Sequence, residues 1–578
     1  MNKPKRIPYA LTNFYKIRTE NYLYVDKTRF IEMLENEDTE YHFLLRPRKF
    51  GKSLFLSVLE HYYDIRFKDK FEELFGDLYI GQNPTPKRNS YFVLNIDFSG
   101  LNTGSVEEFK VSFSNNIEAC IIDFFIRYDY LVDADFQKKL ELQFIDESGK
   151  IGVDAIKKHI FNFVQKNKGK LYVIIDEYDH FANDIIAKGT QMSKNQYQES
   201  IWANSITKDF YETLKNGAKS VIDKIFITGI TPIMLDDLTS GFNISNNLSV
   251  DVRYNEVLGL TREEVEWVME QVCLDKSQIS LDIEKMYDGY LFHEKGNNKL
   301  FNSTMIFNYL RGFLNEGNDF KYIVDDNLKT DYGRIRNLVD KFKNKTKLRK
   351  LVENNSVGGN VIKQFSIEKI HEDKNFFSLL YYMGLITIDN SDNTSQRLTI
   401  PNYSVKTIFW DFIENMLTEE IEGLSLDNSQ YEDPVNSLAY KNSYELFFEY
   451  FSKNIVKYLS NRDLQETVEK DIKFLLLPLF FTSNYYLPIS ELENSEGYTD
   501  IYLQRSHLHP NTISEWLWEI KYIKQKDAKK KSLIDAKKKE AIERLQAYKT
   551  SNLFKHRTDV RFLAVVFTGK NEWFVEEV

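Results

Sequence analysis

Short apolar runs alternate with longer amphipathic stretches through the first 250 residues of the chain. Residues 90–98, 171–175 and 224–230 have the length and the apolar character of strands that are buried on both faces. Helical periodicity fills the stretches between them, over about 105–130 and 154–166. Strands that alternate with helices predict a parallel sheet with right-handed crossovers and helices around it.

The pattern becomes mainly helical after residue 260. Thr261 and Glu264 have the spacing of a capping box, and helical periodicity continues to about Leu417. Within this region, 377–388 predicts a helix, a glycine turn and a strand, and 397–402 predicts the return strand. A helix followed by a hairpin is typical of a winged-helix module. Such modules bind DNA or serve as lids on ATPases, and we favour the lid.

A polar stretch at 424–440 separates this helical region from a last segment that contains both strands and helices. A chain of 578 residues is too long for one ordinary core. We therefore expect an α/β domain at 1–250, a helical lid and winged-helix-like region at 251–423, a linker at 424–440 and a second α/β domain at 441–578.

A phosphate-binding loop is predicted between an apolar run that ends at Leu45 and the helix that follows. Gly51, Lys52 and Ser53 match the end of the pattern G-x-x-x-x-G-K-[ST]. Arg46 stands at the first glycine of the pattern. Gly51 lets the backbone approach a phosphate, Lys52 reaches the β- and γ-phosphates, and the Ser53 hydroxyl binds Mg²⁺ in such loops. A chance Gly-Lys-Ser at a helix start is the alternative. The candidate nucleotide-binding residues of the loop are Arg46, Pro47, Arg48, Lys49, Phe50, Gly51, Lys52 and Ser53.

Acids at the end of a later buried run strengthen the nucleotide interpretation. The apolar run 171–175 ends in Asp176 and Glu177. An acid at the carboxyl end of a central strand can hold Mg²⁺ beside a phosphate loop, and the next acid can polarise a water for attack on the γ-phosphate. Thr228, near the end of 224–230, is a candidate γ-phosphate sensor, with a plain strand-end turn as the alternative.

A second group of charged residues lies near the end of the chain. Asp500 lies near the start of one predicted strand, and Glu519 and Lys521 lie in the next, 516–522, at positions that face the same side. A hairpin would place two carboxylates and a lysine on one sheet face. That arrangement suits Mg²⁺-dependent phosphodiester hydrolysis, with Asp500 and Glu519 as metal ligands.

A third acid for this group comes from the predicted helix 464–477, which offers Glu466 and Glu469. The alternative interpretation is an exposed strand with an ordinary Glu–Lys pair. A charged pair inside a strand that also holds two tryptophans is unusual, and it favours the catalytic interpretation.

Composition excludes several classes of protein. A net charge of −10 argues against a basic protein that coats DNA, and the lysine-rich stretch 524–539 predicts a solvated helix face, with contact to DNA phosphates as the alternative. Cys120 and Cys273 form neither a metal cluster nor a disulfide framework. No run approaches the ~18–20 apolar residues of a membrane helix and no signal core follows the basic start, so we expect a cytoplasmic protein without membrane contact.

On these motifs, the first part of the chain resembles the bacterial AAA-ATPase-like proteins. Arg-Pro-Arg in place of the first glycine is usual in that family. The stretches that carry the resemblance are 6–9, 24–28, 46–53, 174–179, 287–290 and 300–303. The last part resembles the PD-(D/E)XK nuclease-like domain usually fused to it, through 469–473, 490–491, 497–500 and 519–522.

The resemblance implies an α/β P-loop NTPase fold at the N-terminus, a PD-(D/E)XK α/β nuclease-like fold at the C-terminus, and ATP, Mg²⁺ and DNA as ligands. Carried over by position, Asp500 and Glu519 are metal ligands. Lys521 positions the water, and Glu469 is the helix acid.

One position departs from the nuclease pattern. Related nuclease cores often carry a glutamine four residues before a tyrosine. Tyr548 fits the tyrosine, but Arg544 stands at the glutamine position, with Gln546 nearby. This departure puts substrate contacts in question more than metal binding.

The function expected from the sequence is ATP binding and hydrolysis that regulates a Mg²⁺-dependent DNA nuclease, with defence or mobile-DNA biology as an analogy-level setting. The alternatives are a nucleotide-dependent switch or scaffold whose nuclease-like fold binds nucleic acid or protein without cleavage, and a nucleotide-binding regulator without nucleic acid. Arg253 and Arg262 are arginine-finger candidates by position only. A homo-oligomer that shares an ATP site, or an unknown protein partner, is therefore left open.

Overall fold

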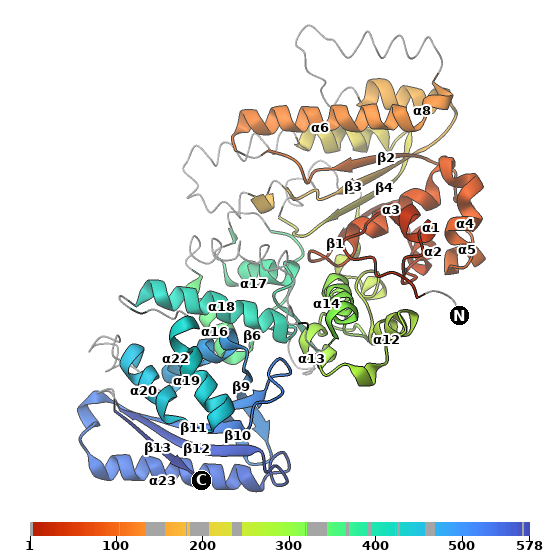
Figure 1. The fold of residues 1–578 in the computed structure, drawn as a ribbon. Helices are drawn as coiled ribbons and strands as arrows, with labels where there is room; N and C mark the ends of the chain where they lie inside the picture. The colour runs from red at the N-terminus through yellow and green to blue at the C-terminus, as the bar shows by residue number, and fades with distance from the viewer. Residues whose placement is uncertain are drawn as a thin grey trace. The chain divides into compact units, whose positions relative to one another are not determined.

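The computed structural model divides the chain into two compact units, residues 1–403 and 404–578 (Figure 1). It describes residues 4–102, 104–132, 156–180, 182–184, 207–233, 245–317, 320, 344–365, 369–370, 372–390, 396–421, 424, 428–456, 469–568 and 572–578. Among these residues, no helix is both long and apolar enough to cross a membrane.

A five-stranded parallel sheet forms the centre of the first unit. Its strands are β1 (Tyr41–Leu45), β2 (Phe92–Asp97), β3 (Leu171–Asp176), β4 (Ile222–Gly229) and β5 (Asn246–Asn247). They are ordered β2-β3-β4-β1-β5, and every pairing is parallel. The continuous apolar runs are buried as expected, and the predicted parallel sheet is confirmed. Because β4 lies between β1 and β3, the phosphate loop and the acids after β3 come to the same sheet edge with Thr228 between them.

Helices surround this sheet. Their bounds are α1 (Phe14–Thr19), α2 (Arg29–Glu35), α3 (Lys52–Tyr63), α4 (Phe71–Phe75), α5 (Tyr79–Gln82), α6 (Val106–Arg127) and α8 (Asn162–Lys166). The long helix α6 runs beside the edge strand β2 (Figure 1). The expected helix at 154–166 is described from residue 156, as a π-helical turn (Ile156–Phe161) followed by α8.

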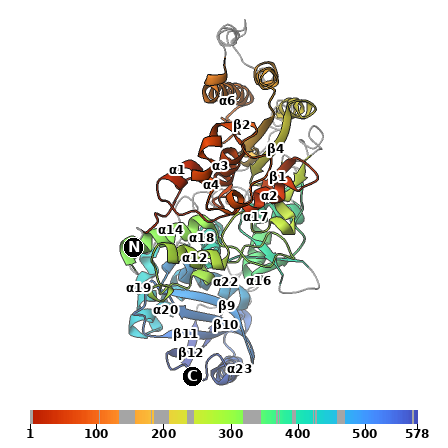
Figure 2. The same cartoon turned by 90° about the vertical axis from the view of Figure 1, so that its right-hand side faces the viewer.

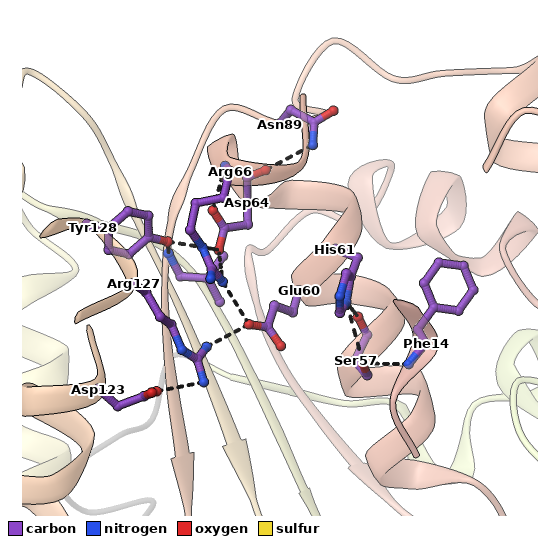
Figure 3. Close-up of polar contacts among 11 residues, drawn as sticks. Phe14, Ser57, Glu60, His61, Asp64, Arg66, Asn89, Asp123, Arg127 and Tyr128 are labelled. Atoms are coloured by element: carbon purple, nitrogen blue, oxygen red, sulfur yellow. Dashed lines mark hydrogen bonds and ion pairs between the residues drawn. The ribbon is translucent and has the colours of Figure 1, made fainter. Parts of the chain in front are cut away.

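A network of buried and partly buried charges fixes the carboxyl end of α3, the helix that begins at the phosphate loop (Figure 3). Glu60 accepts from Arg66 at 3.1 Å and from Arg127 at 2.6 Å. The fully buried Asp64 carboxylate accepts from Arg66 at 2.7 Å and from the Tyr128 hydroxyl at 2.9 Å. These bonds tie α3 to α6, so the helix behind the loop is held at its far end.

The middle of the chain is mainly helical, as predicted. It contains α12 (Arg262–Gln271), α13 (Ile283–Tyr287), α14 (Ser303–Glu316), α16 (Lys345–Asn354), β6 (Ser356–Gly358), α17 (Asp373–Tyr382), β7 (Thr387–Asp389) and β8 (Arg397–Thr399). The capping box of Thr261 and Glu264 is present at the start of α12.

The predicted winged-helix-like module is also confirmed. Strands β6, β8 and β7 form a three-stranded antiparallel sheet after α16 and around α17. Residues 375–382 of α17 are buried, so most of this helix packs against protein. The burial favours the lid interpretation over insertion of α17 into a DNA groove.

A mixed five-stranded sheet forms the centre of the second unit. Its order is β13-β12-β11-β10-β9, and only the β11–β12 pair is parallel. The strands are β9 (Tyr486–Asn494), β10 (Gly497–Arg505), β11 (Glu515–Ile523), β12 (Val560–Thr568) and β13 (Trp573–Glu577). The helices are α18 (Tyr403–Glu420), α19 (Asn428–Lys441), α20 (Glu445–Asn454), α22 (Glu469–Ser483) and α23 (Lys531–Thr550). Helix α23 lies against β11 and β12 in both views (Figure 2).

The stretch expected to be a linker, 424–440, is largely helix α19 in the structure. Val435, Leu438 and Ala439 are buried, and their spacing forms one apolar helix face within a mostly polar sequence. The boundary between the compact units lies after residue 403, before the expected boundary at 423. Helix α18 belongs mostly to the second unit because Trp410 stacks on Phe481, with ring centroids 5.2 Å apart.

Candidate functional site

The phosphate loop connects the end of β1 to the start of α3. Lys49 and Gly51 have left-handed backbones, with φ of +67° and +99°. Glycine adopts the φ of +99° at position 51 without steric cost. The Lys52 ammonium is buried and donates to the carbonyls of Arg46 at 3.0 Å and Pro47 at 3.1 Å. Burial lowers the pKa of Lys52, while the nearby carboxylates of Asp176 and Glu177 oppose this shift.

The Arg46 side chain is buried in the first unit and makes its polar contacts with the protein itself. Its guanidinium is fully buried and donates to the carbonyls of Leu45 at 2.9 Å, Ser249 at 2.8 Å and Tyr254 at 2.7 Å. It also lies 4.0 Å from the centroid of the Phe292 ring. Arg46 therefore binds the loop to the middle region of the chain.

Other loop residues are clamped by the same middle region. Phe50 packs edge-on against Phe292 at 5.4 Å, and its carbonyl accepts from Gly259 N–H at 3.2 Å. A Cβ on Gly384, which follows α17, would lie only 2.7 Å from Cβ of Pro47. The winged-helix-like module thus packs directly on the phosphate loop.

Asp176 joins the loop to the neighbouring strand. Its Oδ2 accepts from the Ser53 hydroxyl at 2.6 Å, and its Oδ1 accepts from the Thr228 hydroxyl at 2.6 Å. A hydroxyl and a carboxylate are hard oxygen ligands of the kind that Mg²⁺ prefers. The donor set of Ser53 and Asp176 therefore fits this metal.

Glu177 has the strained backbone common at functional sites, with φ of +50°. Its Oε2 lies 3.4 Å from Nδ1 of His180. The His180 ring lowers the pKa of Glu177 against the effect of burial, with help from Arg48 and Lys52. The carboxylate is thus held in its ionised form.

Sequence reasoning assigned no role to two further acids at this edge. Asp97 ends β2 and is the register partner of Asp176. Asp179 is fully buried and accepts from the N–H of Ile230 at 3.1 Å and of Thr231 at 2.6 Å, which ties the turn after β3 to the end of β4. The signal for Asp97 was available, because it ends an apolar run as Asp176 does.

A cavity of about 490 Å³ opens on the phosphate loop. Its other walls come from the N-terminal segment and from the middle region of the chain. They include Leu23, Tyr24, Val257, Leu258 and Phe307. The buried Lys27 connects the N-terminal segment to the middle region of the chain, because it donates to Glu264 at 2.7 Å and to the Glu256 carbonyl at 3.0 Å.

Both arginine-finger candidates are engaged in ion pairs within the first unit. Arg253 pairs with Asp251 at 2.6 Å and with Glu37 at 2.7 Å. Arg262 pairs with Glu284 at 2.8 Å. The side chains are 53% and 57% exposed, so their guanidinium groups also face solvent.

The second centre lies where β10 and β11 pair. The predicted antiparallel hairpin is present, with Ile501 opposite Trp518, so Asp500 and Glu519 follow as neighbours across the strands. Both acids are buried. Asp500 Oδ2 accepts from the Ile520 N–H at 2.7 Å, which fixes that carboxylate against β11.

Glu519 has one satisfied and one orphaned oxygen. Oε1 accepts from Lys521 at 2.8 Å and from Arg544 of α23 at 3.0 Å. Oε2 is buried without a hydrogen-bond partner. Burial raises the pKa of Glu519, and the Asp500 charge adds to this shift. A buried, unpaired carboxylate oxygen beside a second carboxylate fits a divalent cation as ligand.

The helix acid Glu469 lies at the start of α22, with Oε2 3.8 Å from the Lys521 ammonium. Glu466 falls outside the described residues. Within the described part of the chain, no three acid, histidine or cysteine side chains are arranged to hold a metal together. Asp500 and Glu519 are therefore the candidate pair of metal ligands. Glu469 forms an ion pair with Lys521.

Two cations at this centre were not assigned from the sequence. Lys473 of α22 donates to Asp500 Oδ1 at 3.1 Å and also bonds Glu491 of β9. Arg544, at the glutamine position of the nuclease pattern, bonds Glu519, while Tyr548 donates to the Tyr498 carbonyl at 2.8 Å. The segment 524–539 runs from the end of β11 into α23, and Lys537 pairs there with Glu540 at 2.8 Å.

Comparisons with known proteins agree with this two-part organisation. Residues 8–239 match the family model described as predicted AAA-ATPase, and residues 467–577 match that of the PD-(D/E)XK nuclease superfamily. The two-part architecture and fold class expected from the sequence are thereby confirmed.

One curated relative is an "Uncharacterized protein in vnfD 5'region" of Azotobacter chroococcum mcd 1, 27% identical over 293 residues. The match covers 50% of this chain and 48% of that protein, so the chain spans about half the length of the relative.

Two solved structures are also similar. The Walker-type ATPase PABY2304 of Pyrococcus abyssi has 14% identity and a TM-score of 0.36, covering 71% of this chain and 99% of that one. Cdc6p from Pyrobaculum aerophilum has 10% identity and a TM-score of 0.25, covering 72% and 96%.

Proposed function

We propose that this protein binds and hydrolyses ATP and that its ATPase domain regulates a Mg²⁺-dependent DNA nuclease in the same chain. The observation that carries the proposal is the buried group of Asp500, Glu519 and Lys521 on adjacent strands. Two carboxylates and a lysine in this arrangement serve phosphodiester hydrolysis. We place this activity in the cytoplasm and, by analogy alone, in defence or mobile-DNA biology.

In the ATPase domain, the N–H groups of the loop bind the phosphates and Lys52 turns from its carbonyl partners to the β- and γ-phosphates. Ser53 and Asp176 hold Mg²⁺, which when bound neutralises phosphate charge. Thr228 orients Asp176, and Glu177 orients the attacking water as an ionised base. The base of ATP lies in the cavity against the apolar side chains of Tyr24 and Leu258.

In the nuclease domain, Asp500 and Glu519 hold the metal, which when bound stabilises charge on the scissile phosphate. Lys521 orients the water because its ammonium is anchored on Glu519 and lies near Glu469. The Ile520 N–H bonds the Asp500 carboxylate and so keeps it oriented toward the metal position beside Glu519. The close approach of Pro47 to Gly384 supports regulation, because it links the phosphate loop to the module that directly precedes the second unit in sequence.

The proposal is tested by incubating the purified chain with linear, supercoiled and single-stranded DNA and Mg²⁺ or Mn²⁺, with and without ATP. Cleavage that is lost in Asp500→Ala and changes its ATP response in Lys52→Ala is the expected result. ATP hydrolysis without cleavage on any DNA contradicts the nuclease part.

The second candidate function is a nucleotide-dependent switch whose nuclease-like domain binds nucleic acid or protein without cleavage. It is favoured by the ion pairs of Lys473 with Asp500 and of Arg544 with Glu519, which compensate both acids. DNA binding in a gel-shift measurement, without strand scission in the cleavage assay, distinguishes this function from the first.

A further inference from the structure

Lys473 is placed inside the acid centre of the second unit, although no role there follows from the sequence. Its side chain is only 9% exposed and reaches the centre from α22. The ammonium donates to Asp500 Oδ1 at 3.1 Å and also bonds a Glu491 oxygen. The side chain is therefore a fixed positive charge.

The position of this charge on Asp500 matters because it lies on an oxygen that could bind a metal ion. Oδ2 accepts from the neutral Ile520 N–H at 2.7 Å, whereas the partner of Oδ1 is a cation. Lys473 occupies that oxygen. The other two cations of the centre, Lys521 and Arg544, bond Glu519 instead.

Glu491 completes the arrangement that holds Lys473. It lies in β9 with a left-handed backbone, φ +56°, and its side chain is 43% exposed. A non-glycine residue in this conformation is strained, and such strain is retained where the surroundings demand it. Glu491 thus offers the ammonium a second partner at the solvent side of the site.

We propose that Lys473 is a built-in competitor of the metal: it neutralises Asp500 in the metal-free site and must move from Oδ1 toward Glu491 when a divalent cation binds. This inference rests on the proposed function, since it requires a metal at Asp500 and Glu519. Lys473 is a positioning residue that acts through Asp500. Its charge opposes a cation at short range in a poorly screened environment, so the lysine sets the metal concentration at which the site fills.

The test is Mn²⁺ binding to the full-length, nucleotide-free protein, measured from the free Mn²⁺ signal in electron paramagnetic resonance. Asp500→Asn defines which sites belong to the acid centre. We expect Lys473→Gln to bind Mn²⁺ about tenfold more tightly than the wild type, because one opposing charge is removed. Lys473→Arg keeps the charge and retains an affinity close to that of the wild type.

Two controls make the comparison specific. Lys470→Gln removes an exposed charge from the same helix and leaves Mn²⁺ affinity unchanged. Lys473→Met removes the charge while keeping an apolar stem, and it replaces Lys473→Gln if circular dichroism shows that the glutamine variant misfolds. We expect the Mn²⁺ concentration that gives half-maximal DNA cleavage to fall together with the dissociation constant for Mn²⁺.

The outcomes separate this inference from the proposed function. Equal or weaker Mn²⁺ binding by both folded, charge-removing variants, with the Asp500-dependent site present in the wild type, overturns the competition and leaves the metal site standing. A wild type that binds no more Mn²⁺ than Asp500→Asn has no metal at this centre, and both proposals then fail.

Discussion

The acids of the phosphate-loop centre and of the β10–β11 centre are held by different kinds of partner. Asp176 accepts hydrogen bonds from two neutral hydroxyls, those of Ser53 and Thr228. Asp500 and Glu519 are instead bonded to cations, Lys473 on one and Lys521 with Arg544 on the other.

This difference has an energetic meaning. Neutral donors leave the charge of Asp176 available to a metal, and the removal of one donor costs only about one hydrogen bond. Cationic donors cancel the charges of a buried acid pair, and removal of one partner leaves an uncompensated charge in the protein. We therefore expect mutations to act mildly at the partners of Asp176 and strongly at the members of the second centre.

The largest expected effect is that of Asp500→Asn on DNA cleavage. The substitution keeps the shape of the side chain but removes a metal ligand and the charge that balances Lys473. We expect the cleavage rate to fall about 10³-fold, the equivalent of several kcal/mol of lost metal stabilisation. The measurement is single-turnover cleavage at saturating Mn²⁺. Asp535→Asn, an exposed acid of α23, is the matched control and cleaves like the wild type.

The next effect is that of Glu177→Gln on ATP hydrolysis. The amide fills the same space but cannot act as a base, so we expect turnover to fall about 10²-fold with ATP affinity retained. Steady-state phosphate release and nucleotide titration measure the two quantities. The exposed Glu72→Gln in α4 serves as the control. Undiminished turnover would assign the water-activating role to another acid, with Asp97 the first to test.

A packing substitution probes how firmly the loop is clamped. Gly384→Ala places a methyl group 2.7 Å from Pro47 at a residue with φ of +78°. We expect it to destabilise the first unit by about 2–3 kcal/mol and to weaken ATP binding, because the loop must shift. Thermal unfolding with and without ATP measures both effects. In Gly358→Ala the added methyl group meets nothing within 4 Å, so this variant should unfold like the wild type.

The smallest expected effect is that of Thr228→Val. The change removes one neutral hydrogen bond to Asp176 and conserves the volume, so we expect a loss of about 1 kcal/mol, or roughly fivefold in ATP turnover. Thr550→Val, which loses an equivalent hydroxyl bond at the end of α23, controls for the chemistry of the change. A loss as large as that in Glu177→Gln would contradict the proposed contrast between the two centres.

Local motifs made the two centres predictable from the sequence. The phosphate loop, the acids after β3 and the hairpin that carries Asp500 and Glu519 each depend on residues that are close in the chain. The helix α19 was missed because Val435 and Leu438 are separated by polar residues and follow Pro434, which together resemble a linker.

Contacts between distant segments could not be read from the sequence in this way. Arg46 meets Ser249 and Tyr254 only after the sheet has brought them together, so its burial could not be inferred from the loop. Lys473 meets Asp500 because α22 packs against the sheet of the second unit. Charge pattern alone presents this lysine as an ordinary helix residue.

The contact between Pro47 and Gly384 also constrains protein engineering. A chimera that takes its phosphate loop from one relative and its winged-helix-like module from another joins surfaces shaped separately, and any side chain larger than hydrogen at position 384 collides with the loop. The two positions must therefore be transplanted as a pair. In directed evolution of the nucleotide site, residue 384 belongs in the same library as residue 47, although 337 positions separate them in the sequence.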